Sequence, residues 1–507
     1  MLHPYQCLAA IGQEYLVAAC GPRLLVLGLD HGRLISDWTS EDNSPEVGRA
    51  DSNGAQQRPA KKQKTGTASA KAPNVIRLTV SEDQHHVVAV TDDKFVRVFE
   101  QESGVLAELS QRCMPKRPCA VQIMPDNATI LIGDKFGDVY SIPLLPSEAS
   151  EAAAAKEQST PQPASTFKAS ATNLTVHTAR NLKALEAQTK QKDFTPRKEP
   201  LKFEHELLLG HVAMLTDMKY LLKEDGGKEK GYILTADRDE HIRISRGPPQ
   251  SHVIEGYCLG HTEFISKICQ VGETNLLVSG GGDGWLGVWD WPEYKLRKKI
   301  DLLGHVRDTN GHQKDDQVAV SGIWSMSIDA AGGMDMEDVI LVACDKIKAL
   351  YIFPLSYLEA DPAQHEKSEF ERPVITEVPF EGCPLDVVVS GDRAIVSVDQ
   401  RQNGKKRIQT FWPRKKGAEG DPLAPVLIEQ EEEEGIEEQL KTLNDYRGPE
   451  KDVTHKELDG LLYGVAEMRK RRDQPEGGDN EERAQGPEDQ ENGQGEQQER
   501  TNYAEEE

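Results

Sequence analysis

Residues 276–290 read Leu-Leu-Val-Ser-Gly-Gly-Gly-Asp-Gly-Trp-Leu-Gly-Val-Trp-Asp, which predicts a strand, a tight turn and a second strand. Two apolar runs flank a turn rich in glycine, the pattern of a β-hairpin. The second run ends in Trp289-Asp290, and a Gly260-His261 pair lies upstream. A Gly-His pair followed by a Trp-Asp pair is the signature of a four-stranded propeller blade.

The same turn recurs along the chain. An Asp followed six residues later by an aromatic residue is found at Asp93, Asp134 and Asp345, and without the aromatic at Asp239. Weaker equivalents occur at Gly21 and near Asp399, which makes seven turns. Asp93 to Asp134 spans 41 residues and Asp239 to Asp283 spans 44, matching the roughly 40–45 residues of a blade. The sequence therefore predicts an all-β, seven-bladed WD-repeat β-propeller.

A propeller must close into a ring, because an open sheet leaves unprotected edge strands. We expect residues near Leu8 to close it by pairing with the last blade, which spans about 383–412.

Composition divides the chain further. We predict the propeller over 1–415, with flexible insertions at about 41–73 and 146–200 and a short polar insertion at about 303–318. An acidic linker (416–453), a short amphipathic helix (454–472) and a disordered acidic tail (473–507) follow. The formal net charge is −25, and residues 429–507 hold 26 Asp and Glu against 10 Lys and Arg. A uniformly basic nucleic-acid binder is thereby excluded.

Eight cysteines occur without a Cys-x-x-Cys pair, which indicates buried free thiols in a reducing compartment. No apolar run approaches the roughly 18 residues of a membrane-spanning helix, so we expect no membrane contact.

Four residues of the repeat at 260–290 are predicted to form a buried structural network. In it the turn carboxylate holds the imidazole, and the Ser hydroxyl links the imidazole to the indole N–H. The four are His261, Ser279, Asp283 and Trp289. They occupy structural positions of the repeat, which argues against a hydrolase triad. The preceding repeat has Ser245 at the Trp position, so its network is predicted to be incomplete.

The glycine-rich turn at 280–284 does not open a helix, so a phosphate-binding loop is disfavoured. No motif for a cofactor or a metal is found, and we predict neither.

The turn in the incomplete repeat carries charge where small residues are usual. Arg238, Glu240 and His241, with Arg243 beside them, are predicted to contact a protein partner. Asp239 is assigned a structural role within this turn. The alternative is a solvated turn without a partner.

Two basic segments lie in the predicted insertions. Lys61, Lys62 and Lys64 suit a nuclear import signal. Lys190, Lys192, Arg197 and Lys198 are possible contacts to RNA phosphates. A solvated loop without a ligand is an equally good interpretation of the second segment.

Thr454 and Glu457 form a capping-box pattern before an apolar periodicity that reaches Met468. The predicted helix docks either on its own propeller or on a partner, and the pattern does not decide between them.

The runs 208–211, 232–245 and 256–266, with 462–470, closely resemble the non-catalytic WD-repeat subunit of eukaryotic, in particular fungal, tRNA (guanine-N7-)-methyltransferase. The resemblance implies a heterodimer in which a separate subunit binds S-adenosylmethionine and methylates guanine N7 in the tRNA variable loop. This chain would then be a non-enzymatic nuclear scaffold that stabilises the catalytic subunit and meets tRNA only through the complex.

The resemblance also directs the charged turn toward the methyltransferase. Arg243 is the expected salt-bridge residue, and its change to Glu is expected to break the complex while the propeller stays folded. The alternative is a general nuclear WD-repeat adaptor in ribosome assembly or ubiquitin ligation.

Overall fold

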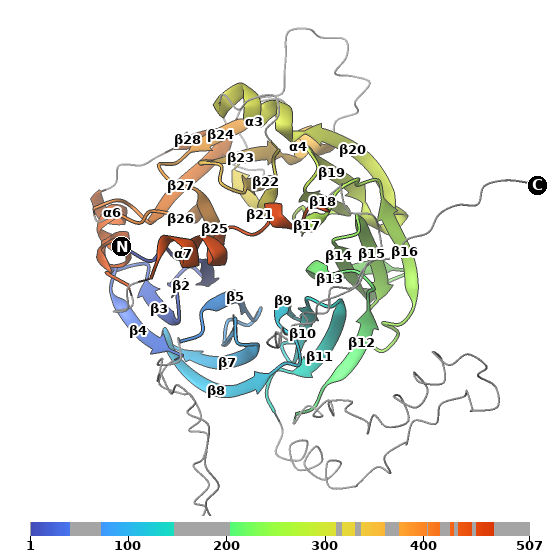
Figure 1. Ribbon diagram of the computed structural model, residues 1–507, viewed down its shortest axis with the longest axis horizontal. Coiled ribbons are helices and arrows are strands. Elements are labelled where there is room, and N and C mark those ends of the chain that lie inside the picture. Colours follow the sequence, from blue (N-terminus) through green and yellow to red (C-terminus); the bar gives the residue numbers. More distant parts are fainter. Residues whose placement is uncertain are drawn as a thin grey trace, which may run out of the picture. The chain divides into compact units, whose positions relative to one another are not determined.

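The computed structural model describes residues 2–40, 72–146, 203–310, 317–329, 336–359, 375–402, 404–415, 426–429, 434–448 and 453–470. In these ranges the chain forms seven four-stranded sheets around a central channel (Figure 1). All pairings within the sheets are antiparallel. The predicted seven-bladed propeller is confirmed.

Each blade takes four strands that follow one another in sequence. Blade 1 holds β1 (Cys7–Ile11), β2 (Tyr15–Cys20), β3 (Arg23–Gly28) and β4 (Leu34–Thr39); blade 2 holds β5 (Val75–Val80), β6 (His86–Thr91), β7 (Phe95–Glu102) and β8 (Val105–Cys113); blade 3 holds β9 (Pro118–Ile123), β10 (Thr129–Asp134), β11 (Asp138–Pro143) and β12 (Glu206–Gly210). Blade 4 holds β13 (Leu215–Asp225), β14 (Lys228–Asp237), β15 (His241–Arg246) and β16 (Ile254–Leu259); blade 5 holds β17 (Ile265–Gln270), β18 (Leu276–Gly281), β19 (Trp285–Asp290) and β20 (Lys295–Asp301). Blade 6 holds β21 (Val320–Asp329), β22 (Met336–Cys344), β23 (Ala349–Pro354) and β24 (Thr376–Pro379); blade 7 holds β25 (Pro384–Ser390), β26 (Arg393–Val398), β27 (Ile408–Lys415) and β28 (Val426–Glu429).

Helical segments are short and lie between or after the blades. They are η1 (Trp291–Glu293), α3 (Leu302–Asn310), α4 (Leu355–Glu359), α6 (Glu434–Asp445), α7 (His455–Leu462) and η2 (Ala466–Met468). None of the helices in the described ranges is long and apolar enough to cross a membrane.

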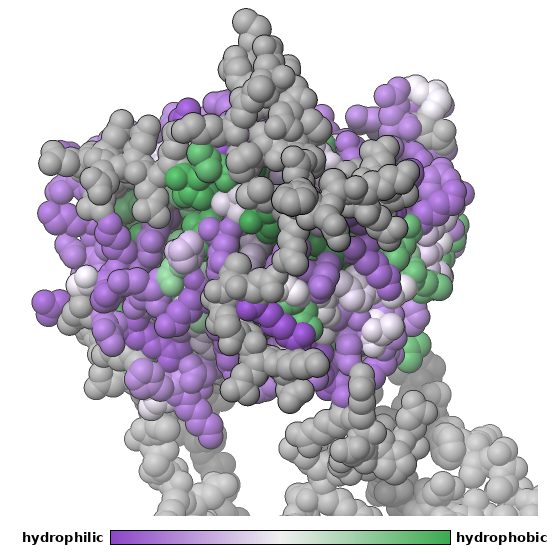
Figure 2. Space-filling model, turned by 90° about the horizontal axis from the view of Figure 1, so that it is seen from above, coloured by the Kyte–Doolittle hydropathy of each residue, from purple (hydrophilic) through white to green (hydrophobic). Residues whose placement is uncertain are grey.

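Apolar side chains from both faces of the middle strands pack between neighbouring blades. Val288 of blade 5 and Val342 of blade 6 belong to one buried cluster, for example. The outer edge in Figure 2 is mostly hydrophilic, with separate hydrophobic areas. The prediction of a polar insertion at 303–318 is wrong for its first half. α3 occupies that half, and it buries Val306 together with Leu302 in the cluster between blades 5 and 6.

The cysteines are free, and five of the eight are buried. Burial raises the pKa of the Cys7 and Cys20 thiols to about 12, which keeps them protonated near neutral pH. Cys113 is exposed, so the prediction of buried free thiols holds for most of them.

The predicted mode of ring closure is wrong. β1 pairs with β2 in blade 1, and the fourth strand of blade 7 is β28, from within the predicted linker 416–453. The propeller therefore extends beyond residue 415. Because each blade has its own four strands, blades 7 and 1 are joined by side chains and by α6 instead of a shared sheet.

α6 packs across the junction between blades 7 and 1. Leu440 and Leu443 are buried there, in the same cluster as Leu16 and Ile395. The Thr442 hydroxyl donates a hydrogen bond to the Gly32 carbonyl at 2.5 Å, which ties α6 to blade 1.

Arg407 is the centre of this junction and has no exposure to solvent. Its Nη1 donates to the His3 carbonyl at 2.9 Å. Its Nη2 donates to the carbonyls of Leu443 at 2.6 Å and Asn444 at 3.1 Å, and also to that of Tyr446. One buried guanidinium thus binds the N-terminal segment and the end of α6 at once.

Asp386 makes the second bond across the junction. Its Oδ2 accepts the Leu8 backbone N–H at 2.8 Å, and its Oδ1 accepts that of Val387 at 2.9 Å. Leu8 therefore does contact blade 7, through a carboxylate and not through a strand. Burial raises the pKa of Asp386 to about 6, although the backbone bonds oppose this shift.

Much of the two predicted insertions lies outside the described residues, as do Lys61, Lys62, Lys64, Lys190, Lys192, Arg197, Lys198 and the predicted tail 473–507.

We predict that Arg407→Met lowers the free energy of unfolding by at least about 3 kcal/mol, since it leaves several buried carbonyls without a donor. Lys405→Met is the matched control. Its ammonium lies 2.8 Å from Glu381, and both side chains are largely exposed, so its loss should change stability by less than about 1 kcal/mol. Urea unfolding measures both, and equal effects would contradict the assigned role of Arg407.

Asp386 also predicts a pH dependence. Its folded pKa lies above its ordinary value of 3.8, so the folded chain binds an extra proton between about pH 4 and pH 6. This contribution to stability is present at low pH and is lost as the pH rises through 6. The difference in unfolding free energy, Asp386→Asn minus wild type, should therefore grow by about 2–3 kcal/mol from pH 4 to pH 7.5. A constant difference would show that Asp386 does not titrate in this window.

Candidate partner-binding surface

The turn between β14 and β15 is organised by Asp237. Its Oδ1 accepts the backbone N–H groups of Asp239 at 2.9 Å and His241 at 3.0 Å. A carboxylate oxygen of Asp237 also lies 3.4 Å from Nδ1 of His211. Burial opposes ionisation here, but the bonds from His211 and His241 outweigh it and lower the pKa of Asp237.

The structural role predicted for Asp239 therefore belongs to Asp237. Thr235 and Asp237 are two residues apart on β14, so they point to the same face of the strand. His211 lies against that face and reaches the Thr235 hydroxyl at 2.8 Å. Asp239 is half-buried in the turn, and Glu240 beside it adopts a left-handed φ of 75°.

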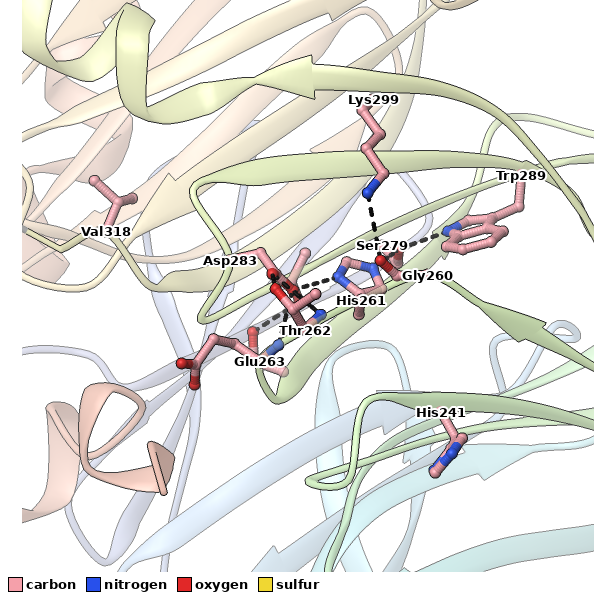
Figure 3. Close-up of polar contacts among 12 residues, drawn as sticks. His241, Gly260, His261, Thr262, Glu263, Ser279, Asp283, Trp289, Lys299 and Val318 are labelled. Carbon is pink, nitrogen blue, oxygen red and sulfur yellow. Dashed lines mark hydrogen bonds and ion pairs between the residues drawn. The ribbon is translucent and has the colours of Figure 1, made fainter. Parts of the chain in front are cut away.

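The network predicted for blade 5 is confirmed (Figure 3). Nδ1 of His261 lies 2.7 Å from Oδ2 of Asp283, and Nε2 lies 2.6 Å from the Ser279 hydroxyl. The Trp289 indole N–H donates to the same hydroxyl at 2.7 Å. Burial opposes the charge of Asp283, yet the bonds from His261 and Thr262 lower its pKa. All of these groups are used within the blade, so they serve the fold.

In blade 4 the large and the small residue of the corresponding pair of positions are exchanged relative to blade 5. Strand pairing places Arg243 opposite Thr235, as it places Gly287 opposite Ser279 in blade 5. Ser245 accordingly stands where blade 5 has Trp289. In blade 5, a Cβ on Gly287 would come within 2.6 Å of the Trp289 indole nitrogen. Glycine there makes room for the indole, whereas blade 4 has a small residue at the Trp position and a large one beside it.

Arg243 fills that space. It is only 8% exposed, and its guanidinium donates to the Ser245 hydroxyl at 2.9 Å and to the Gly210 carbonyl at 3.0 Å. Burial lowers its pKa. Arg243, which was predicted to bridge to a partner, is thus held inside the blade. We now expect Arg243→Glu to destabilise the propeller, where the sequence led us to expect that it stays folded. A charged residue on a strand was expected to face solvent, but the missing indole leaves room for it inside the blade.

The C-terminal strap, residues 455–469, lies across one face of the propeller and its channel (Figure 1). The predicted capping box is present, since Thr454 and Glu457 each bond the backbone N–H of the other. The helix ends at Leu462 and not at 472, because Tyr463 is extended and Gly464 follows. The prediction left two docking sites open, and the structure shows the strap on its own propeller.

Contacts of the strap reach four blades. The Tyr463 hydroxyl donates to Asp399 of blade 7 at 2.6 Å, and the Ala466 N–H donates to Asp345 of blade 6 at 3.4 Å. Arg469 lies over the Phe264 ring, which precedes blade 5. Nε of Arg238 donates to the Met468 carbonyl at 2.7 Å. Arg238, predicted to contact a partner, thus anchors the strap to blade 4.

His241 is the residue of the predicted set that faces outward most clearly, with a side chain 47% exposed. It packs edge-on against Tyr257, with 6.2 Å between ring centroids. Tyr257 is 40% exposed, and Leu259, paired with His241 across β15 and β16, is 59% exposed. In Figure 3 His241 lies on the hairpin of blade 4, apart from the network of blade 5.

Two more exposed apolar residues lie at the junction of blades 3 and 4. Phe136 is 63% exposed and Val212 fully so. They are neighbours in space, because the His211 N–H donates to the Gly137 carbonyl at 2.9 Å. We call the set Phe136, Val212, His241, Tyr257 and Leu259 the docking surface. Exposed apolar residues gathered with polar ones mark protein interaction sites.

Sequence reasoning missed the apolar members of this surface. Phe136 occupies a tight turn, where a polar residue or glycine is usual. This unusual phenylalanine was the sequence feature that could have indicated the docking surface. The exposure of Tyr257 and Leu259 depends on which strand is outermost, and that of Val212 depends on the path of the loop between β12 and β13. The local sequence reveals neither.

Comparison with known proteins places these features in a family. The family model described as the tRNA methyltransferase TRM82 WD40 domain matches residues 16–416. A relative named tRNA (guanine-N(7)-)-methyltransferase non-catalytic subunit TRM82, from Phaeosphaeria nodorum, is 42% identical over 70% of this chain and 75% of its own length. The subunit of the same name from Aspergillus fumigatus is 36% identical over 92% of this chain and 98% of its own length. This chain belongs to the family of WD40-domain proteins that are the non-catalytic subunits of tRNA (guanine-N(7)-)-methyltransferase.

Proposed function

We propose that this chain is the scaffold that binds and stabilises the catalytic subunit of tRNA (guanine-N7-)-methyltransferase, and that N7-methylguanosine formation in tRNA depends on this contact. Family membership supports a catalytic partner. The single observation that supports the place of binding is the docking surface at blades 3 and 4, which includes His241 of the charged turn.

The charged turn divides into internal and external parts. Arg243 and Arg238 are used inside the molecule, by blade 4 and by the strap. Glu240 and His241 lie on the same turn, where His241 pairs with the exposed Leu259. We propose that the apolar members provide the buried centre of the interface and that Glu240 and His241 provide part of its polar rim, the usual arrangement of protein interfaces.

The chemistry of the docking surface restricts which partner can bind to it. A partner must cover Val212 and Leu259 with apolar groups, and it must also complement an imidazole beside Tyr257. Rim groups of this kind direct orientation more than they add affinity. The tRNA is met through the complex, in which the catalytic subunit performs the chemistry.

We predict that Leu259→Asp weakens binding of the catalytic subunit at least about tenfold, since a carboxylate in the apolar centre must be desolvated without a partner. Met336→Asp is the matched control, because Met336 is similarly exposed, at 61%, but belongs to blade 6. Both melting temperatures should stay near that of the wild type. Interferometry with the purified catalytic subunit gives the affinities, and wild-type affinity of Leu259→Asp would refute this placement.

Arg243→Glu tests whether Arg243 maintains the fold of blade 4 or contacts the partner directly. Burying a carboxylate where a guanidinium bonds Ser245 and Gly210 should lower the melting temperature of the free chain, and binding should fall only as the folded fraction falls. A folded Arg243→Glu chain that no longer binds would instead mean that Arg243 reaches the partner directly.

A further inference from the structure

The central channel has a cavity of about 590 Å³. Inner strands of all seven blades line it, and the strap closes one side with Leu461, Tyr463 and Met468. A volume of this size suits a small molecule. The scaffold role proposed above makes no use of this cavity.

The charges on the cavity wall are unbalanced. Six cationic side chains line it: Arg77, Arg117, Lys135, Lys219, Lys267 and Lys346. Three carboxylates line it: Asp217, Asp345 and Asp386. The wall is therefore positively charged in a chain whose formal net charge is −25.

The three carboxylates are already used in the structure. Asp217 accepts the Ile268 N–H at 3.0 Å, and Asp386 accepts the Leu8 N–H, each from the next blade around the ring. Asp345 accepts the Ala466 N–H of the strap. These bonds hold blades and strap together and draw the carboxylates toward the backbone.

Three of the cations are not paired with a carboxylate in the part of the chain that the structure describes. Among the described residues, neither Lys219 nor Lys267 has a carboxylate oxygen within 4.0 Å of its ammonium nitrogen. Arg77 donates through Nε and Nη1 to the carbonyls of Cys119 and Ile76, and its Nη2 makes no bond in this part of the chain. Asp217 favours the charged form of Lys267, but burial and the charges of Arg77 and Lys219 outweigh it and lower its pKa.

We infer that the channel is a binding site for a small polyphosphate anion, held by Lys267, Lys219 and Arg77 beneath the strap. Lysine supplies point charges, and a guanidinium donates hydrogen bonds that fit phosphate oxygens. The three cations come from three different blades, so they approach the ligand from different sides. The strap covers one side of the cavity, and partial burial strengthens each of these interactions.

The test uses the full chain and sodium tripolyphosphate at constant ionic strength, with calorimetry and thermal unfolding. We expect saturable binding of one anion per chain and a rise in melting temperature that follows the occupied fraction. In Lys267→Met the affinity should fall at least about tenfold, the factor expected for loss of one charge-assisted bond. The free Lys267→Met chain should also melt higher than the wild type, because it loses an ammonium that burial and the charges of Arg77 and Lys219 disfavour.

Lys295→Met is the matched control. Lys295 is exposed on the outer strand β20, 3.6 Å from Glu293, and its loss should leave anion binding unchanged. Two results would overturn the inference: no saturable binding of tripolyphosphate at millimolar concentration, or equal binding by the wild type and Lys267→Met. Sulfate at the same ionic strength should give no comparable shift. Leu259→Asp should bind tripolyphosphate normally, so the outcome does not depend on the proposed function.

Discussion

Arg407 holds the beginning and the end of the ring together from a position without solvent contact. Its guanidinium donates to carbonyls of the N-terminal segment and of the end of α6. Asp386 adds a bond to the Leu8 backbone across the same junction. Propellers must protect their edges, and this one does so without sharing a strand between its first and last blades. A buried charge is tolerated here because several carbonyls satisfy it.

A closed ring places the loops of different blades at fixed positions, which a binding platform requires. Blade 4 shows how closely fold and surface are connected. Blade 4 has Arg243 and Ser245 where blade 5 has Gly287 and Trp289, and it is still well packed. His241, beside the same turn, faces outward. The strap then uses Arg238 from the same turn and leaves His241, Tyr257 and Leu259 uncovered. These three residues are thus held on paired strands, β15 and β16 of blade 4.

The local parts of this architecture were predictable from sequence, and the long-range parts were not. Residues 260–290 contain every member of the His261 network at its repeat spacing, so the pattern alone identified it. The capping box at Thr454 was equally local. Ring closure depends on Arg407 and α6, which meet the N-terminal segment from more than 400 residues away in sequence. The periodicity of a sequence carries no information about contacts between residues so far apart. Arg243 was misplaced because its burial follows from the absence of an indole two residues away, a packing relation that propensity does not express.

We propose that this chain performs no chemistry itself and holds a catalytic subunit through blades 3 and 4. The most direct measurement is N7-methylguanine formation on tRNA by the catalytic subunit alone, by this chain alone and by both together, with the docking-surface variant as a fourth sample. The account predicts full activity only for the wild-type pair, none for this chain alone and a marked loss with the variant. Undiminished activity of the catalytic subunit without this chain, or methylation by this chain alone, would contradict it.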